Sequence, residues 1–331
     1  MPPSTPSPPS APDAHAPVLA REVSRALAPA LGHADGGSRG VLVDATCGLG
    51  GHVRAVLGHA RPRLVVGFDR DPDALALARA ALADAPCPIE LVDAPFSELV
   101  PRLAALDVVE VDAVLADLGV SSLQLDRGAR GFSWRADAAL DMRMDPRRGA
   151  AAADVLAGID AAELTKILRD YGEEPDASRI ARAIVAARPR TTVELAEVVT
   201  QAMSAPQRRK LGLRIHPATR TFQALRIHVN DELGELDRLL ADAPELLAVG
   251  GRLAVISFHS LEDRRVKRRV QELTRPPRVP AHVPLREHEL PRPRFAVPEG
   301  FARGVTAQPD EIAANPRSRS ARLRVVERIA A

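Results

Sequence analysis

Short apolar runs alternate with longer amphipathic stretches along the first third of the chain. The runs predict strands over 41–45, 64–68, 89–92 and 111–116. The stretches between them predict helices over 51–58, 72–83 and 97–105. Strands that alternate with helices favour an α/β fold with a parallel sheet covered on both faces. Ligands of such sheets bind beyond the carboxyl ends of the strands. The residues that directly follow each strand are therefore the first candidates for a functional site.

This alternation stops after residue 124 and resumes after residue 214. The segment 125–214 has helical periodicity over 161–169, 178–187 and 193–203, with Asp160 and Thr192 as predicted N-caps. Beyond it, the pattern predicts helices over 218–230, 232–247 and 262–273, and strands over 252–257 and 322–328. We therefore expect one α/β domain formed by 15–124 and 215–331, with a helical insert at 125–214. Residues 1–14, rich in proline and serine, are predicted to be a disordered tail.

Composition narrows the class of protein. The 331 residues are 46% hydrophobic and 27% charged, as in ordinary globular proteins, and the net charge of +2 gives no overall basic field. The sequence has no apolar run of about 18 residues and no signal-peptide pattern at its start. The two cysteines, Cys47 and Cys87, form neither a disulfide framework nor a metal cluster. These features predict a cytoplasmic protein without a membrane segment or a bound metal.

A glycine-rich turn, Val41-Leu-Val-Asp-Ala-Thr-Cys-Gly-Leu-Gly-Gly-His52, follows the first predicted strand. Glycines there allow a ligand to lie against the backbone, and a helix start favours negative ligand groups. A dinucleotide fingerprint would need a third glycine where Val53 stands. The acid-x-Gly-x-Gly-x-Gly pattern of S-adenosylmethionine (SAM) methyltransferases fits better. Counted from Asp44, its three positions hold Thr46, Gly48 and Gly50.

Acidic residues stand at the ends of two further strands. Asp69 lies about 20 residues beyond the glycines, where an acid binds the ribose hydroxyls in nucleotide-binding βαβ folds. Asp71 precedes a proline and is predicted to be a helix N-cap. Asp117 ends the fourth strand and is a candidate for contact with the cofactor or the attacking group. Phe96, after the third strand, either covers an adenine ring or packs in the core.

Basic residues gather locally despite the low net charge. Arginines mixed with aromatic residues suit phosphate contact and base stacking. Candidates in the insert are Arg127, Arg130, Arg135, Arg143, Arg147, Arg148 and the run 207–214. The helix over 262–273 carries the densest basic cluster in the chain. His259, just before that helix, is either catalytic or a structural histidine.

Several motifs together resemble one family, the bacterial 16S rRNA (cytosine-N4)-methyltransferases of the MraW type. The residues that carry the resemblance are His15-Ala-Pro-Val-Leu19, Gly50-Gly-His52, Asp69-Arg-Asp-Pro72, Asp117-Leu-Gly-Val-Ser-Ser122, Gly131-Phe-Ser-Trp134, Leu140-Asp-Met-Arg-Met-Asp145, Tyr171-Gly-Glu-Glu174, Ile180-Ala-Arg-Ala-Ile184, His216-Pro-Ala-Thr-Arg-Thr-Phe-Gln-Ala224, Ile256-Ser-Phe-His-Ser-Leu-Glu-Asp263 and Asn315-Pro-Arg-Ser-Arg-Ser320. They span nearly the whole chain after the tail. Ser-Phe-His-Ser-Leu-Glu-Asp and Asp-Met-Arg-Met-Asp are far more specific than a glycine loop.

The resemblance implies a Rossmann-like, SAM-dependent methyltransferase domain whose helical insert meets RNA. The implied reaction methylates the exocyclic N4 amine of a decoding-centre cytidine in 16S rRNA of the small ribosomal subunit, with no DNA substrate and no membrane partner. By position, the residues implied to bind SAM are Gly50, Gly51 and His52 at the methionine end, Asp69 at the ribose, Phe96 at the adenine, and Asp117 and Gln124 completing the pocket.

The sequence departs from the family pattern in several places. Leu123 replaces a frequent proline, and Val53 replaces a small polar residue. After Tyr-Gly-Glu-Glu the family usually has a basic residue and an aromatic, whereas this chain has Pro175 and Asp176. The last difference puts in doubt a contact of the insert with RNA or within its own core.

The expected chemistry is direct displacement, with Asp117 accepting a hydrogen of the cytosine amine. Methylation at cytosine carbon 5 would need a Pro-Cys pair after the fourth strand, but Pro86-Cys87 precedes the third. Amine methyltransferases of DNA usually carry Asp/Asn-Pro-Pro-aromatic at the fourth strand, and Asp117-Leu-Gly-Val120 differs from it. A non-catalytic SAM-binding assembly factor and an amine methyltransferase of another nucleic acid stay open. A nicotinamide-dependent dehydrogenase is disfavoured by Val53.

Overall fold

The computed structural model of the chain describes residues 17–32, 40–126, 128–212, 216–276 and 292–331. Its main body is an eight-stranded sheet in the order β3-β2-β1-β4-β5-β8-β6, with β7 also paired to β8. The strands are β1 (Val41–Asp44), β2 (Leu64–Asp69), β3 (Ile89–Asp93), β4 (Val111–Asp117), β5 (Leu247–Ser257), β6 (Phe295–Ala296), β7 (Val305–Thr306) and β8 (Arg322–Arg328).

Strands β1 to β5 run parallel, which confirms the α/β fold with a parallel sheet. Val43 of β1 pairs with Val66 of β2 on one side and with Val114 of β4 on the other. The order of the strands reverses at β1, so the crevice between β1 and β4 is the expected ligand position. β8 is antiparallel to β5 and continues the sheet on that side. The sequence did not predict the short strands β6 and β7, and β5 begins earlier than the predicted residue 252.

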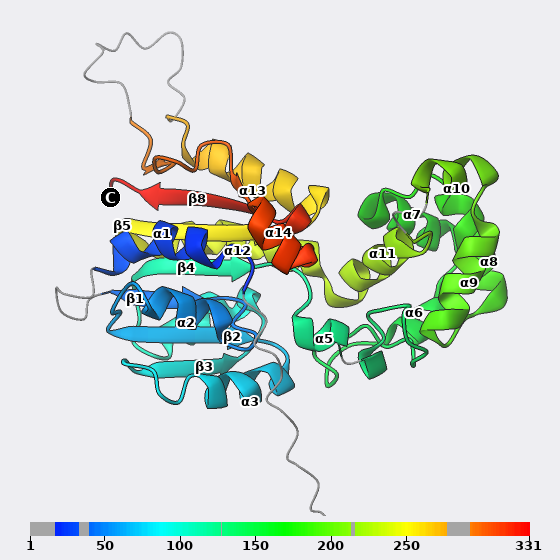
Figure 1. The fold of residues 1–331 in the computed structure, drawn as a ribbon, viewed down its shortest axis with the longest axis horizontal. Coiled ribbons are helices and arrows are strands. Elements are labelled where there is room, and N and C mark those ends of the chain that lie inside the picture. The colour runs from blue at the N-terminus through cyan, green and yellow to red at the C-terminus, as the bar shows by residue number, and fades with distance from the viewer. Residues whose placement is uncertain (1–16, 33–39, 127, 213–215, 277–291) are drawn as a thin grey trace, which may run out of the picture.

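Helices cover both faces of the sheet because alternate residues of each strand point to opposite sides. Leu42 packs with α1, α2 and α3 in one core, whereas Val41 and Val43 pack with α4, α12 and α13 in the other. These helices, with the short α14 beside α1 (Figure 1), are α1 (Ala20–Leu31), α2 (Gly51–Leu57), α3 (Pro72–Ala81), α4 (Leu99–Ala104), α12 (Glu232–Leu246), α13 (Ser260–Leu273) and α14 (Pro309–Ala314).

A separate helical unit extends beyond the end of the sheet, on the right in Figure 1. It has a third apolar core that includes Leu164, Ile180 and Leu195. Its helices, reached through the short α5 at the sheet edge, are α5 (Ser122–Asp126), α6 (Ala152–Gly158), α7 (Ala161–Gly172), α8 (Ala177–Ala187), α9 (Thr192–Ala202) and α10 (Ala205–Leu211). Helix α11 (Thr219–Asn230) also contributes Phe222 and Leu225 to this core, so the unit shares a helix that lies beyond residue 214.

Of the two N-caps predicted for the helical unit, one is confirmed and one is wrong. Asp160 caps α7 as expected, by accepting from the backbone N–H groups of Ala162 and Glu163. The cap of α9 is Thr191 rather than Thr192, because Thr191 forms a reciprocal capping box with Glu194. Thr192 is buried, and its hydroxyl donates to the carbonyl of Ala136 at 2.7 Å.

The sequence predicts neither a disulfide framework nor a membrane-spanning segment. Both cysteines, Cys47 and Cys87, are free thiols. Within the described ranges, no helix is both long and apolar enough to cross a membrane. The predicted tail at 1–14, Arg127 and Arg214 lie outside the described residues.

Candidate active site at the carboxyl edge of the sheet

The loop between β1 and α2 turns sharply at two glycines. Gly48 has φ of +52° and Gly50 has φ of +80°, a region that favours glycine. A Cβ on Gly50 would also lie 2.9 Å from the side chain of Leu82. Around Gly48, by contrast, a Cβ would meet only the carbonyl of Thr46, at 3.8 Å. The loop is therefore closed on the side of α3 and open where a ligand can approach its backbone.

Thr46 joins the ends of β1 and β4. Its hydroxyl accepts from the backbone N–H of Asp117 at 2.6 Å, and its own N–H donates to Asp44 at 3.1 Å. The sequence pattern identifies Thr46 only as a residue at a glycine position of the SAM motif. The signal that could have identified its role is the side-chain hydroxyl, which at a strand end readily bonds to nearby backbone.

Three titratable side chains, Asp44, His52 and Asp117, meet beyond these two strands and are called the edge cluster here. His52 Nε2 lies 3.3 Å from Asp117 Oδ2, an ion-pair contact when the imidazole is protonated. Within the described part of the chain, Asp44 Oδ2, both ring nitrogens of His52 and Asp117 Oδ1 are buried without a hydrogen-bond partner. Buried polar groups are normally satisfied, so the edge cluster has unused bonding capacity.

Burial and mutual charge set the protonation of the edge cluster. Burial raises the pKa of Asp44 to about 6, although His52 opposes the shift. Burial alone would lower the pKa of His52, but the neighbouring carboxylates of Asp117 and Asp44 outweigh it and raise that pKa. The cluster therefore favours a protonated imidazole between two carboxyl groups.

Asp69, at the end of β2, fixes the glycine loop from the other side. Its two carboxylate oxygens accept from the backbone N–H groups of Gly48 and Asp71, each at 2.8 Å. Burial raises the pKa of Asp69 to about 6 in spite of these donors. Asp71 itself caps α3, as predicted, by accepting from the N–H of Asp73. Each oxygen of Asp69 retains a further lone pair for a hydroxyl ligand.

Gln124 and Phe96 complete this edge. Gln124, in α5, is buried; its amide donates to Asp71 at 2.9 Å and accepts from Ser121 N–H at 3.0 Å. Phe96 opens a 3₁₀ turn (Phe96–Glu98) directly after β3, and its half-buried ring packs against the core under the sheet. The structure thus brings Gly50, Gly51, His52, Asp69, Phe96, Asp117 and Gln124 to one edge of one sheet.

The family of this chain follows from a comparison with known protein families. The model of the MraW methylase family matches residues 13–329, almost the entire chain. The chain belongs to this family. It is therefore a SAM-dependent methyltransferase, as the sequence predicted.

Curated relatives match the methylase over most of its length. It is 50% identical over 326 residues to the ribosomal RNA small subunit methyltransferase H of Aromatoleum aromaticum, covering 96% of this chain and 98% of that protein. The protein of the same name from Halorhodospira halophila is 52% identical over 300 residues, 88% of this chain and 89% of that one. A solved rRNA methylase from Streptococcus thermophilus is 13% identical with a TM-score of 0.36, over 94% of this chain and 93% of that one.

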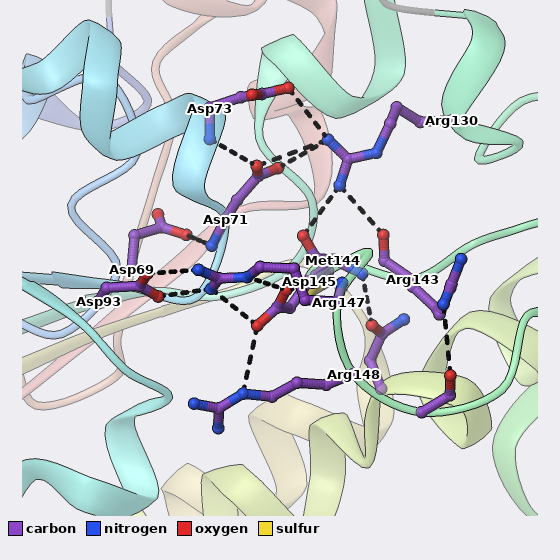
Figure 2. A network of polar contacts seen from close by, with 12 residues as sticks. Asp69, Asp71, Asp73, Asp93, Arg130, Arg143, Met144, Asp145, Arg147 and Arg148 are labelled. Atoms are coloured by element: carbon purple, nitrogen blue, oxygen red, sulfur yellow. Dashed lines mark hydrogen bonds and ion pairs between the residues drawn. The ribbon is translucent and has the colours of Figure 1, made fainter.

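In this methylase, several arginines predicted to meet RNA are bonded within the protein (Figure 2). Arg130 lies 3.2 Å from the fully buried Asp71 and donates to the carbonyls of Arg143 and Met144. Arg147 donates to both oxygens of Asp93, at 2.6 and 2.7 Å, and also to Asp145. We call these residues, Arg130 and Arg147 with Asp71, Asp93 and Asp145, the arginine clamp.

The arginine clamp joins the insert to the ends of β2 and β3. Its hydrogen bonds lower the pKa of Asp93, because the Arg147 guanidinium stabilises the charged carboxylate. Arg148 and Arg143 are also paired, with Asp145 and Asp141. Arg135, on the same segment, is exposed. Arg130 and Arg147 therefore join the insert to the sheet.

His259 is a helix cap in the methylase. It accepts from the N–H of Glu262, and Glu262 in turn accepts from the N–H groups of Phe258 and His259. This reciprocal capping box favours the structural interpretation of His259. On the basic face of α13, Arg264 pairs with Glu173 of the insert at 3.1 Å. Among the described residues, no group of three or more histidines, cysteines or acids could hold a metal ion.

Proposed function

We propose that this methylase transfers a methyl group from SAM to the exocyclic N4 amine of a decoding-centre cytidine in 16S rRNA of the small ribosomal subunit. The observation that carries the chemistry is the edge cluster, whose carboxyl oxygens at the ends of β1 and β4 include two without a hydrogen-bond partner in the described part of the chain. The observation that supports the substrate is the name of relatives about half identical to this chain, ribosomal RNA small subunit methyltransferase H.

The residues at the sheet edge suit the chemical groups of SAM. The open backbone at Gly48 and the turn before α2 admit the methionine end, with Gly50, Gly51 and His52 around it. The spare lone pairs of Asp69 suit the two ribose hydroxyls. Phe96 would cover the adenine, and Gln124 with Asp117 would close the pocket. SAM supplies a methyl group on a positively charged sulfonium.

The cytosine N4 is a poor nucleophile because its lone pair is conjugated with the ring. An acceptor for an N4 hydrogen lets the nitrogen become pyramidal. In the reaction N4 bonds to the methyl carbon, the carbon–sulfur bond breaks, and one N4 proton leaves. Asp117 Oδ1, buried and without a hydrogen-bond partner among the described residues, is the proposed acceptor. Alignment of N4 with the methyl group supplies a large further part of the rate.

His52 is proposed to position Asp117 rather than to touch the base. The imidazole lies 3.3 Å from Asp117 Oδ2, on the opposite oxygen from the one left unpaired. The backbone of Asp117 is held by the Thr46 hydroxyl at 2.6 Å. Together these contacts fix the carboxylate and leave Oδ1 for the amine. A flipped or unpaired cytidine would be needed to reach this position.

Methyl transfer from radiolabelled SAM tests the proposal. Purified protein is offered small subunits, free rRNA and DNA from cells lacking the enzyme, and the labelled nucleoside is identified by mass spectrometry. We expect label as N4-methylcytidine in the small subunit. Label on another nucleoside would leave a methyltransferase with a different target. SAM binding without transfer would instead indicate a non-catalytic assembly factor.

A further inference from the structure

The insert has a cavity of its own, away from the sheet edge. It is lined by residues from the end of α9, from α10, from the start of α11 and from the loop after α7, and its volume is about 190 Å³. The described residues that line it are Glu174, Met203, Gln207, Lys210, Leu211 and Arg220. The roles assigned to the methyl-transfer site use none of them.

Glu174 is the acidic member of this lining and is almost fully buried, with 3% of its surface exposed. Its Oε1 accepts from the N–H of Asp176 at 3.2 Å. Its Oε2 has no hydrogen-bond partner among the described residues. Burial raises the pKa of Glu174, and the positive charge of Arg220 opposes the shift only in part. A buried carboxyl oxygen without a donor costs free energy unless a ligand supplies one.

The backbone around Glu174 is held firmly, although the sequence departs from its family there. Asp176 accepts from the N–H of Ser204 at 2.7 Å, which ties the loop after α7 to the start of α10. Glu173 has a left-handed φ of +48° and donates its backbone N–H to the carbonyl of Arg169. Asp176 thus serves an internal contact of the insert. The Glu174 carboxylate is consequently presented in one fixed place.

The other lining groups offer apolar surface and positive charge. Met203 and Leu211 supply apolar atoms against which a flat ring can pack. Arg220 is oriented by a hydrogen bond from its guanidinium to the carbonyl of Glu173, at 3.0 Å. Lys210 is exposed at the end of α10. A cavity with one buried acceptor, apolar walls and cations at its margin matches the parts of a nucleotide: base edge, ring face and phosphate.

We propose that this cavity binds one unpaired guanine of the RNA substrate, with Glu174 accepting from the base. The proposal rests on the proposed function only in that the substrate is RNA. Guanine carries two adjacent donors, N1–H and the N2 amine, which one carboxylate accepts together. Lys210 and Arg220 contact the phosphate of the same nucleotide.

The other bases fit the carboxylate less well. Uracil flanks its single N3–H with two carbonyl oxygens, which a carboxylate repels. Cytosine and adenine each present one amine beside a ring nitrogen that is itself an acceptor. A site built around a buried acceptor discriminates strongly against a ligand without the matching donors, because its own polar group is left unpaired. Guanine is therefore favoured over uracil most of all.

Binding of guanosine and uridine 5′-monophosphates to the full chain tests this directly, without any methyl transfer. The measurement is made by saturation-transfer NMR with S-adenosylhomocysteine present in excess. We expect guanosine monophosphate to bind about tenfold more tightly than uridine monophosphate. Glu174→Gln, which keeps the contact with Asp176 but turns the second oxygen into a donor, removes that preference. Equal affinities in the wild type, or no binding of guanosine monophosphate, would overturn the proposal.

The matched controls come from the same insert. Glu197→Gln on α9 changes the same charge at an exposed position and keeps the preference for guanine. Lys210→Ala weakens both nucleotides severalfold, because it contacts phosphate, whereas Lys166→Ala on α7 leaves both unchanged. A loss of preference in Glu197→Gln equal to that in Glu174→Gln would also overturn the proposal. Failure of methyl transfer to small subunits would contradict the proposed function but not this binding result.

Discussion

The edge cluster and the arginine clamp lie at the same edge of the sheet but differ in how their carboxyl groups are paired. In the clamp, the buried Asp71 meets Arg130 and Gln124, and Asp93 meets both terminal nitrogens of Arg147. In the edge cluster, Asp44 and Asp117 each keep a buried carboxyl oxygen without a hydrogen bond within the described chain. Similar residues at neighbouring strand ends are satisfied in one place and unsatisfied in the other.

This difference separates the charges that stabilise the fold from the charges that are available for a ligand or a reaction. Breaking a buried charge pair such as Arg130–Asp71 is costly, so this pair of the clamp fixes how the insert lies against the sheet. Unsatisfied buried groups destabilise the folded chain, and they persist where the strain serves a ligand or a reaction. The comparison therefore predicts that removing charge from the edge cluster costs activity while sparing the fold. Removing charge from the clamp should do the reverse.

The largest effect is expected for Asp117→Asn. The amide keeps the shape of the side chain but cannot take a proton from the N4 amine. We expect the single-turnover rate of methyl transfer to fall about 10²- to 10⁴-fold, with an unchanged melting temperature. Rapid-quench kinetics with radiolabelled SAM measures the rate, and circular dichroism measures the melting temperature.

Glu110→Gln is the matched control for this variant. Glu110 is exposed just before the opposite end of β4, so its change leaves the rate unaltered. A wild-type rate in Asp117→Asn would remove Asp117 from the mechanism. A large fall in its melting temperature would instead place Asp117 with the structural charges of the clamp.

The next largest effect is expected for Arg130→Ala. The side chain is only 15% exposed, and its loss leaves Asp71 with Gln124 but without its cation. We expect the free energy of unfolding to fall by about 3 kcal/mol, measured by urea denaturation. Arg135→Ala, an exposed arginine of the same segment, should change it by less than about 0.5 kcal/mol. Equal losses in the two variants would show that the clamp does not hold the insert.

The sheet and most helices could be predicted from sequence because burial imposes a strict period on each strand and helix. The acids at the strand ends, Asp69 and Asp117, could be found by the same rule. The clamp could not be predicted, because an arginine that binds phosphate and one that binds a carboxylate have the same local pattern. The partner of Arg147, Asp93, lies 54 residues away in the chain. The role of Thr46 could not be predicted either, because it depends on a hydrogen bond to another strand.

Asp44→Asn is expected to stabilise the protein near neutral pH. The pKa of Asp44 is about 6 in the folded chain and 3.8 ordinarily, so the folded state binds the extra proton between these values. The free energy of unfolding therefore falls as pH rises from about 4 to about 6, and the cost is fully present above that range. We expect a gain of about 1–3 kcal/mol at pH 7.5 in urea denaturation, which disappears below about pH 4.

The control for Asp44→Asn is Asp137→Asn, an exposed acid in the insert, which should leave the free energy of unfolding unchanged at every pH. Methyl transfer by Asp44→Asn should fall, because His52 loses one of the two carboxylates that favour its protonated form. A gain in stability that is the same at pH 4 and pH 7.5 would contradict the assignment of the cost to the Asp44 charge.

The smallest effect is expected when a fall in pH protonates Asp69 and lowers the affinity of the site for S-adenosylhomocysteine. Its pKa is about 6, raised by burial, and the proposed bonds to the ribose hydroxyls need the charged carboxylate. Affinity for S-adenosylhomocysteine should therefore fall about tenfold as pH drops from about 8 to about 5, when measured by isothermal titration calorimetry. Because Asp44 and His52 are further titratable groups of this edge, the experiment is repeated in Asp69→Asn, and the pH dependence that this variant loses belongs to Asp69. If Asp69→Asn keeps the pH dependence of the wild type, Asp69 does not hold the ribose through its charge, and its carboxylate belongs with the structural charges that fix the glycine loop.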